Sequence, residues 1–289
     1  MIAADALANA AAKLAANGTE SARLDARVLL AHVLEKRPGE LLGRFEISAT
    51  QMAAFHGAIS RRLAHEPVAY ITGHKEFWSL DFEVGPGVLV PRPETETLIE
   101  QVLLEFPDRV SDLKAIDWGT GSGCIALSFL SEFPNAQAFG IERSSDAMAF
   151  ARRNKARYPF GDRLALGERD WRESPAGPFD IAFCNPPYLA LDDLANVTPE
   201  LRAEPEAALL GGPDGLTAYR VLAPLIAERL TAPTGRAFLE IGAGQSHDII
   251  AILASAGLET MRIAPDLSGT ARCIVARPQK TVGISGRSL

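Results

Sequence analysis

The sequence predicts an α/β protein, in which a doubly wound parallel sheet is accompanied by a small N-terminal helical domain. Three observations lead to this fold class. Apolar residues recur at helical spacing up to about residue 75, the pattern changes to a two-residue period over residues 76–91, and apolar strands alternate with helices from residue 114 onward. Strands that alternate with helices form parallel sheets with helices on both faces.

The composition is that of a globular protein with an acidic balance. Of the 289 residues, 29 are lysine or arginine and 36 are aspartate or glutamate, so the formal net charge is −7. This charge argues against a protein that coats nucleic acid, and we expect no stable nucleic-acid partner. The sequence has no run of about 18 uncharged apolar residues, so we expect no membrane span.

The cysteines and histidines indicate neither a disulfide framework nor a metal site. The three cysteines, Cys124, Cys184 and Cys273, are widely spaced and form no CxxC motif. The five histidines show no metal-ligand spacing. We therefore expect no metal, and a reducing cytoplasm is the expected compartment.

Residues 1–75 are expected to form a helical bundle. Leu7, Ala11 and Leu14 lie on one face of a first helix, a second helix follows, and a third is expected over about residues 50–64. This region has nine basic and seven acidic residues, whereas the rest of the chain is acidic. The difference gives weak support to a substrate-docking role, and an ordinary solvated helical surface is the simpler explanation.

The segment 76–92 is predicted to link the two domains as a β-hairpin. Apolar residues alternate on both sides of Gly85-Pro86-Gly87, which we expect to form the turn. A helix is expected to follow over about residues 94–105, with acidic residues in its first turn. The predicted boundaries are therefore 1–75 for the bundle, 76–92 for the linker and 93–289 for the sheet domain.

The sheet domain is predicted from short apolar runs and the helices between them. The expected strands are 115–118, 137–141, 164–166, 181–184, 237–241, 261–263 and 273–276, and the expected helices are 124–130, 146–157, 216–230 and 247–256. Ligands of such sheets bind at the carboxyl ends of the strands, so the segments that follow the strands are where a site is expected.

A glycine-rich loop follows the first of these strands. Gly119-Thr120-Gly121-Ser122-Gly123 has the spacing GxGxG rather than the GxGxxG of dinucleotide-binding proteins, which favours a nucleoside without a pyrophosphate. Glu142, at the end of the next strand, is placed to accept hydrogen bonds from both ribose hydroxyls. A tight turn beside a fortuitous acid is the alternative, but strand, loop, helix and acid occur in the required order. Together they resemble the S-adenosylmethionine site of class I methyltransferases.

The sequence Asn185-Pro186-Pro187-Tyr188 follows the strand 181–184 and should face the same crevice. The prolines fix the backbone and donate no N–H, so the Asn185 side-chain oxygen and the Pro186 carbonyl can both point outward as acceptors. A planar NH₂ group requires two acceptors, and Tyr188 offers a flat ring to cover such a group. A proline-rich turn without a function is the alternative.

This arrangement suits the methylation of an sp² nitrogen that carries hydrogens. The lone pair of such a nitrogen is delocalised. When two acceptors on the protein bind both of its N–H groups, the electron density on the nitrogen increases and the nitrogen is aligned with a methyl donor. Most of the rate acceleration is expected from positioning and desolvation. The motif by itself does not distinguish adenine, guanine or glutamine as the acceptor.

Further segments make a resemblance to one family specific. Glu66-Pro67-Val68-Ala69-Tyr70, Pro91-Arg92-Pro93-Glu94-Thr95-Glu96, Gly211-Gly212-Pro213-Asp214-Gly215 and Asp266-Leu267-Ser268-Gly269 closely resemble the release factor glutamine methyltransferases of the HemK/PrmC family. The resemblance runs from about Asp25 to Arg277. It implies a helical bundle, a β-hairpin and a class I methyltransferase domain, the Rossmann-like form of the doubly wound sheet.

The resemblance also implies an activity. Members of this family transfer a methyl group from S-adenosylmethionine to the side-chain amide nitrogen of the glutamine in the Gly-Gly-Gln motif of class-1 peptide chain release factors, which modulates translation termination. S-adenosylhomocysteine is the product. A release factor is therefore the expected partner, and a monomer is expected.

The family's site residues carry over by position. Gly119, Thr120, Gly121, Ser122 and Gly123 would line the methionine part of the cofactor, Glu142 would hold the ribose, and Asp170 and Trp171 would border the adenine. Asn185 would touch both cofactor and acceptor, and Asn185, Pro186, Pro187 and Tyr188 would bind the glutamine amide; the catalytic residues are expected to be Asn185, Pro186 and Tyr188.

Two positions depart from the family's usual pattern without putting the activity in doubt. Glu142 stands where the family more often has aspartate, and Cys124 where it often has alanine. Cys124 and Cys184 border the expected site, but we expect small buried packing rather than a catalytic thiol. Arg92 and Glu94 could clamp the substrate backbone or cap the following helix, and the sequence does not decide between these roles.

Two other functions are alternatives to glutamine methylation. An amino-methyltransferase acting on adenine or guanine in RNA or DNA shares the catalytic motif, but the net charge of −7 and the lack of an evident basic domain disfavour it. A non-catalytic cofactor-binding protein would be expected to have lost Asn185 or a loop glycine, and neither is missing.

Overall fold

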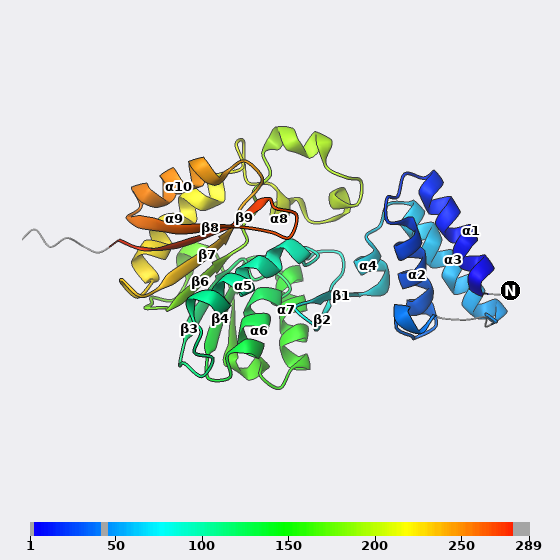
Figure 1. The fold of residues 1–289 in the computed structure, drawn as a ribbon, viewed down its shortest axis with the longest axis horizontal. Coiled ribbons are helices and arrows are strands. Elements are labelled where there is room, and N and C mark those ends of the chain that lie inside the picture. Colours follow the sequence, from blue (N-terminus) through cyan, green and yellow to red (C-terminus); the bar gives the residue numbers. More distant parts are fainter. Residues whose placement is uncertain (1–2, 42–45, 280–289) are drawn as a thin grey trace, which may run out of the picture. The chain divides into compact units, whose positions relative to one another are not determined.

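The structure, a computed structural model, describes residues 3–41 and 46–279. It divides into two compact units, which are described separately (Figure 1). The first contains residues up to 75 together with 84–86 and 197–204, and the second contains 76–83, 87–196 and the chain from 205 onward.

Helices form the first unit. They are α1 (Ala3–Ala16), α2 (Ala22–Val33), α3 (Ala49–Leu63) and α4 (Val68–Thr72). Their core contains the fully buried Leu14, Leu29 and Phe55. A capping box starts α3, because Ser48 Oγ accepts a hydrogen bond from Gln51 N (3.2 Å) and Gln51 Oε1 accepts one from Ser48 N (3.1 Å). The predicted third helix is confirmed, one residue earlier at each end.

A buried arginine joins three parts of this unit. Arg62 on α3 donates from Nε to Asp25 Oδ2 on α2 (2.7 Å) and from Nη2 to Glu200 Oε1 in the segment 197–204 (2.7 Å). The Arg62 and Asp25 side chains are 6% and 9% exposed. The neighbouring Arg61 instead pairs with Glu66 at the surface. The segment 197–204 is therefore attached to the helices through an ion pair whose arginine is buried and whose glutamate is partly exposed.

The hairpin exists, but the sequence placed its turn in the wrong position. The strands are β1 (His74–Phe77) and β2 (Leu80–Glu83), and Trp78 and Ser79 form the turn with φ of 52° and 59°. Two positive φ angles define a type I′ turn, which is normally built from asparagine and glycine, so Trp78 and Ser79 carry no residue signal for it. Val88 and Val90, the alternating apolar residues after the predicted turn, are buried but belong to no strand.

The second unit is built on a seven-stranded sheet with the order β5-β4-β3-β6-β7-β9-β8. Its strands are β3 (Lys114–Trp118), β4 (Gln137–Glu142), β5 (Leu164–Glu168), β6 (Ile181–Cys184), β7 (Arg236–Glu240), β8 (Leu258–Pro265) and β9 (Ala271–Pro278). The first five are parallel, as expected for a doubly wound sheet, and β9 is antiparallel to both of its neighbours, so the sheet is mixed at that edge.

A tight turn explains the reversed strand. Asp266 Oδ1 accepts hydrogen bonds from the backbone N–H groups of Ser268 (2.9 Å) and Thr270 (3.1 Å), which closes the connection between β8 and β9. Only antiparallel strands can be joined by so short a connection, whereas a parallel pair needs a long crossover.

Helices cover both faces of this sheet (Figure 1). They are α5 (Glu96–Glu105), α6 (Cys124–Glu132), α7 (Ser145–Arg157), the short α8 (Glu206–Leu209), α9 (Thr217–Arg229) and α10 (Ser246–Ser255). Helices α9 and α10 pack together over one core cluster that includes Trp118, Tyr219 and Ile249. In the described part of the chain, no helix combines the length and the apolar character that crossing a membrane requires.

The buried arginine gives a direct test of what stabilises the helical unit. Replacing Arg62 with Met should lower the free energy of unfolding by about 3 kcal/mol, because Asp25 is left as a buried charge without its partner. Replacing Arg61 with Met removes a largely exposed ion pair and a long hydrogen bond to the Tyr70 carbonyl oxygen (3.4 Å), and it should cost less than about 1 kcal/mol. Urea unfolding followed by circular dichroism measures both, and equal losses would contradict a dominant role of the buried pair.

Candidate active site

Strand register brings four functional segments to the same end of the sheet. Trp118 on β3 pairs with Ile141 on β4 and with Cys184 on β6, and Cys184 pairs with Leu239 on β7. The next residue on each strand is therefore Gly119, Glu142, Asn185 or Glu240. Parallel pairing alone puts the glycine loop, the acid and the Asn-Pro-Pro-Tyr segment side by side.

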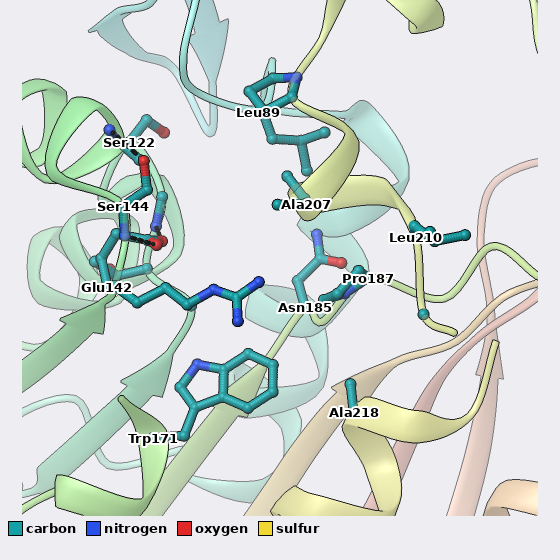
Figure 2. A pocket seen from close by; sticks show the side chains of 18 of the residues that line it. Leu89, Ser122, Glu142, Ser144, Trp171, Asn185, Pro187, Ala207, Leu210 and Ala218 are labelled. Atoms are coloured by element: carbon teal, nitrogen blue, oxygen red, sulfur yellow. Dashed lines mark hydrogen bonds between the residues drawn. The ribbon is translucent and has the colours of Figure 1, made fainter. Parts of the chain in front are cut away.

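A cleft of about 460 Å³ opens at this end of the sheet, a volume typical of small-molecule sites. Figure 2 shows Glu142 and Ser144 on one side of it, Ala207 and Leu210 on the other, and Asn185 and Trp171 between them. The predicted site residues that line it are Gly119, Thr120, Gly121, Ser122, Glu142, Asp170, Trp171, Asn185 and Pro187. Gly123, Pro186 and Tyr188 lie beside the cleft without lining it.

The glycine loop has a backbone shape that strongly favours glycine. Gly119, Gly121 and Gly123 have φ of 81°, 55° and 83°, in the left-handed region. The backbone N–H groups of Gly119 and Thr120 both donate to the Ile141 carbonyl oxygen (2.8 and 2.9 Å). A Cβ on Gly119 would lie 3.8 Å from the Trp171 ring, so the glycine keeps open the space that faces the indole.

A buried aspartate holds this loop from below. Thr120 Oγ1 donates to Asp117 Oδ2 (2.6 Å), and the Asp117 side chain is fully buried. Burial raises the pKa of Asp117 to about 7, against the lowering effect of the Thr120 hydroxyl. The Thr120 side chain is thus used to fix the loop.

The acid after β4 is oriented by the backbone. Glu142 Oε2 accepts a hydrogen bond from Gly121 N (3.1 Å), and its Oε1 accepts one from Ser144 N (2.9 Å), as the dashed lines of Figure 2 mark. Each carboxylate oxygen has a second lone pair, so both can still accept a hydrogen bond from a ligand. The carboxylate is therefore preorganised for two neighbouring hydroxyl groups.

Asp170 and Trp171 form the wall below this acid. Asp170 caps the 3₁₀ turn Trp171–Glu173, because its Oδ1 accepts from Arg172 N (3.0 Å) and from the Arg172 guanidinium (3.2 Å). The Trp171 indole lines the cleft and presents a flat apolar surface. This is the kind of surface on which a planar base packs.

The Asn-Pro-Pro-Tyr segment presents the asparagine to the cleft. Asn185 Nδ2 donates to Thr95 Oγ1 (3.3 Å), which leaves the lone pairs of Oδ1 available to a donor. Tyr188 points away, since its hydroxyl donates to Glu240 Oε1 (3.4 Å) and its carbonyl oxygen accepts from Gln245 Nε2 (2.8 Å). Burial and the nearby Glu240 carboxylate raise the pKa of the Tyr188 phenol.

The opposite wall was not assigned from the sequence. It includes α8 and the glycines after it, and its lining residues are Pro205, Ala207, Ala208, Leu210, Gly211 and Gly212. Gly211 lies so close to the Asn-Pro-Pro-Tyr segment that a Cβ there would be 2.6 Å from the Pro187 carbonyl oxygen. The signal was present, since the motif at 211–215 was part of the family resemblance, but no role was attached to it.

Other lining residues follow predicted ones directly. Arg143 and Ser144 come after Glu142 in sequence, and Leu89 and Arg92 come from the segment before α5. Arg92 therefore faces the cleft, and it makes no side-chain cap to the turn Pro93–Thr95.

The two cysteines near the site are buried, and Cys124 also lines the cleft. Cys124 and Cys184 are buried, and burial raises the pKa of the Cys124 thiol to about 12 and that of the Cys184 thiol well above its ordinary range. Both thiols are therefore protonated at neutral pH and are poor nucleophiles.

Comparisons with known proteins agree with this site. The family profile of a methyltransferase domain matches residues 109–238, and that of the PrmC N-terminal domain matches residues 5–73. A methyltransferase structure from Pyrococcus furiosus has the same fold, with a TM-score of 0.51 at 20% identity over 76% of this chain and 97% of that one. The fold and the cleft together define a class I methyltransferase.

The relatives narrow the class. The release factor glutamine methyltransferase of Rhodospirillum rubrum is 40% identical over 92% of this chain and 82% of its own, and that of Cereibacter sphaeroides is 41% identical over 96% and 99%. The chain belongs to the release factor glutamine methyltransferase family and is an S-adenosylmethionine-dependent enzyme.

Thiol chemistry tests the assignment of the cysteines. In the native protein, fewer than one of the three thiols on average should react with the reagent in the time that all three react in the guanidinium-unfolded protein. The reason is that each cysteine is buried. Titration with a chromogenic disulfide measures this. Rapid reaction of one thiol in the native protein, or loss of methyl transfer in Cys124→Ala, would contradict the packing role.

Proposed function

We propose that this chain transfers a methyl group from S-adenosylmethionine to the side-chain amide nitrogen of the glutamine in the Gly-Gly-Gln motif of class-1 peptide chain release factors. The observation that carries the proposal is the position of Asn185, whose side-chain oxygen is left free at the strand end beside the glycine loop and Glu142. Family membership supplies the acceptor, since the relatives are named for release factor glutamine.

The cleft residues fit the proposed cofactor. Gly119 to Gly123 would cradle its methionine part, where a Cβ on Gly119 would fill the space facing the indole. The Glu142 carboxylate would accept hydrogen bonds from the two ribose hydroxyls, and Asp170 and Trp171 would border the adenine. When bound, S-adenosylmethionine supplies an electrophilic methyl group on a positively charged sulfur.

The chain's own contribution to the reaction is to orient an amide. Asn185 Oδ1 and the Pro186 carbonyl would each accept one N–H of the glutamine amide, which fixes the nitrogen and raises its electron density. Pro187 lines the cleft beside them, and the Tyr188 ring packs behind this corner. Positioning of this kind can supply several kcal/mol of a barrier, on the order of 7–11 in well-oriented systems.

The helical unit is proposed to dock the release factor. The match of its sequence to the PrmC N-terminal domain supports this role, as does its charge, because residues 1–75 are basic on balance within an acidic chain. A nucleic-acid acceptor has no comparable support, since the net charge of −7 opposes binding to a polyanion.

Replacing Asn185 with Ala should lower kcat for release factor methylation at least about 100-fold, because the amide loses one of its two acceptors. Affinity for S-adenosylhomocysteine should change by less than about threefold, since the glycine loop and Glu142 are retained. Transfer of labelled methyl groups measures the first effect and calorimetry the second. Asn135→Ala, an exposed site whose amide bonds the Val110 carbonyl, is the matched control.

Two results would contradict this proposal. The first is normal methyl transfer by Asn185→Ala. The second is incorporation of label into bulk RNA or DNA rather than into purified release factor under the same conditions.

Replacing Glu142 with Gln should weaken S-adenosylmethionine binding about 10- to 100-fold, because an amide cannot accept from both ribose hydroxyls while also accepting from Gly121 and Ser144. Calorimetry with the purified protein measures this. Glu259→Gln, which removes an exposed carboxylate paired with Arg277, should bind normally. Unchanged affinity of Glu142→Gln would remove this residue from the cofactor site.

A further inference from the structure

A chain of hydrogen bonds runs behind the catalytic asparagine. Asn185 Nδ2 donates to Thr95 Oγ1 (3.3 Å), and Thr95 Oγ1 donates to Glu240 Oε2 (2.6 Å). Thr95 and Glu240 are both 1% exposed. Glu240 follows Leu239, the residue that pairs with Cys184, so the sheet places it beside Asn185. The three side chains come from three segments that only the fold brings together.

The direction of this chain fixes which way the Asn185 amide faces. An ionised carboxylate has no proton to give, so the single Thr95 hydroxyl proton must point to Glu240. Thr95 then offers Asn185 only lone pairs, which can pair with Nδ2 but not with Oδ1. The Asn185 oxygen is therefore turned toward the cleft, where the proposed function needs an acceptor.

Protonation of Glu240 would remove this constraint. A protonated carboxyl group could donate to Thr95 Oγ1, and the Thr95 hydroxyl could then donate to Asn185 Oδ1. The amide would flip and present its NH₂ group to the substrate NH₂ group. Two donors face each other in that arrangement, so the acceptor nitrogen would no longer be held.

The surroundings of Glu240 make its charge sensitive to pH. Burial raises its pKa to about 7, while the Thr95 and Tyr188 hydroxyls and the Arg272 guanidinium oppose that rise and Glu94 adds to it. The titratable and charged groups that face it are Glu94, Cys124, Tyr188, Tyr219, Arg272 and Cys273. Tyr219 Oη also donates to the Glu240 backbone carbonyl (2.7 Å), which anchors this strand end.

We propose that Glu240, acting through Thr95, is a positioning residue that sets the orientation of the Asn185 amide for methyl transfer. This inference rests on the proposed function of Asn185. It assigns no contact with substrate to Glu240, whose effect passes through the Thr95 hydroxyl. The enzyme is therefore active with Glu240 ionised, and kcat falls as the pH drops through about 7.

The test removes the hydroxyl and keeps the shape. Thr95→Val should lower kcat about 10- to 100-fold, while KM for S-adenosylmethionine and for release factor changes by less than about threefold. Thr95→Ser should restore kcat to within about threefold of wild type, because the relay returns. Thr97→Val, a similarly buried threonine two residues further on in α5, should keep wild-type kcat.

The pH profile separates positioning from structural support. The kcat of the wild type should fall as the pH is lowered, with an apparent pKa near 7; this fall is the acid limb of the profile. Both Thr95→Val and Glu240→Gln should have a low kcat and no acid limb. A merely structural role would lower the melting temperature of the variants and leave the limb in place. Wild-type kcat in Thr95→Val, or an unchanged acid limb in Glu240→Gln, would overturn the inference.

The same assay distinguishes failure of this inference from failure of the proposed function. If Asn185→Ala is inactive and Thr95→Val is normal, the relay is wrong and the amide clamp stands. If Asn185→Ala is itself active, the proposed role of Asn185 fails first. Should Thr95→Val not fold, the pH profiles of Thr95→Ser and Glu240→Gln still decide, because the first must keep the acid limb and the second must lose it.

Discussion

The site depends on the parallel register of β3 with β4 and β6. Trp118 is the last residue of β3 and pairs with Ile141 and Cys184, so each chain leaves the sheet at the same level. A shift of one residue in any strand would turn its side chains to the opposite face of the sheet. Glu142 would then leave the glycine loop, and Asn185 would leave the cleft. The buried core that includes Trp118 and Tyr219 favours this register, because a slip would move apolar side chains out of it.

The carboxylates at these strand ends differ in burial, and their roles differ accordingly. Asp117 and Glu240 are almost completely buried, and each accepts the hydroxyl proton of one threonine, Thr120 or Thr95. Each of them orients the threonine that donates to it, and neither lines the cleft. Glu142 is only partly buried and accepts from backbone N–H groups, which leaves lone pairs directed to the cleft. The preorganised acceptors therefore meet the ligand without rearranging, which is where positioning contributes most to a rate.

Local patterns in the sequence were sufficient for most of the fold and for the residues nearest the proposed cofactor. The strands of the sheet lie within about three residues of their predicted bounds, as do the helices α5, α6, α7, α9 and α10. Gly119 to Ser122 of the predicted loop line the cleft, and so does Glu142. The turn at Trp78 and Ser79 was missed because its positive φ angles occur without glycine or asparagine. The direction of β9 was missed because a buried strand has the same apolar pattern whichever way it runs.

Contacts between distant segments were beyond any pattern in the sequence. Thr95 and Glu240 are 145 residues apart, and nothing at either position marks the pair. In the wall formed by α8 and Gly211, Gly211 lay in a segment that the sequence marked, and it did so only as part of a family resemblance. Segment 197–204 belongs to the helical unit although the chain around it belongs to the sheet unit, and its ion pair with Arg62 could not be foreseen from spacing.

A crystal structure of the protein with S-adenosylhomocysteine and a peptide containing Gly-Gly-Gln would show whether Asn185 and Pro186 hold the glutamine amide. We expect the glutamine side-chain nitrogen within about 3 Å of both Asn185 Oδ1 and the Pro186 carbonyl oxygen, at hydrogen-bonding distance. In the same crystal, the ribose hydroxyls should donate hydrogen bonds to the Glu142 carboxylate. A glutamine amide bound away from this corner, or an Asn185 amide whose Nδ2 faces the peptide, would contradict this expectation.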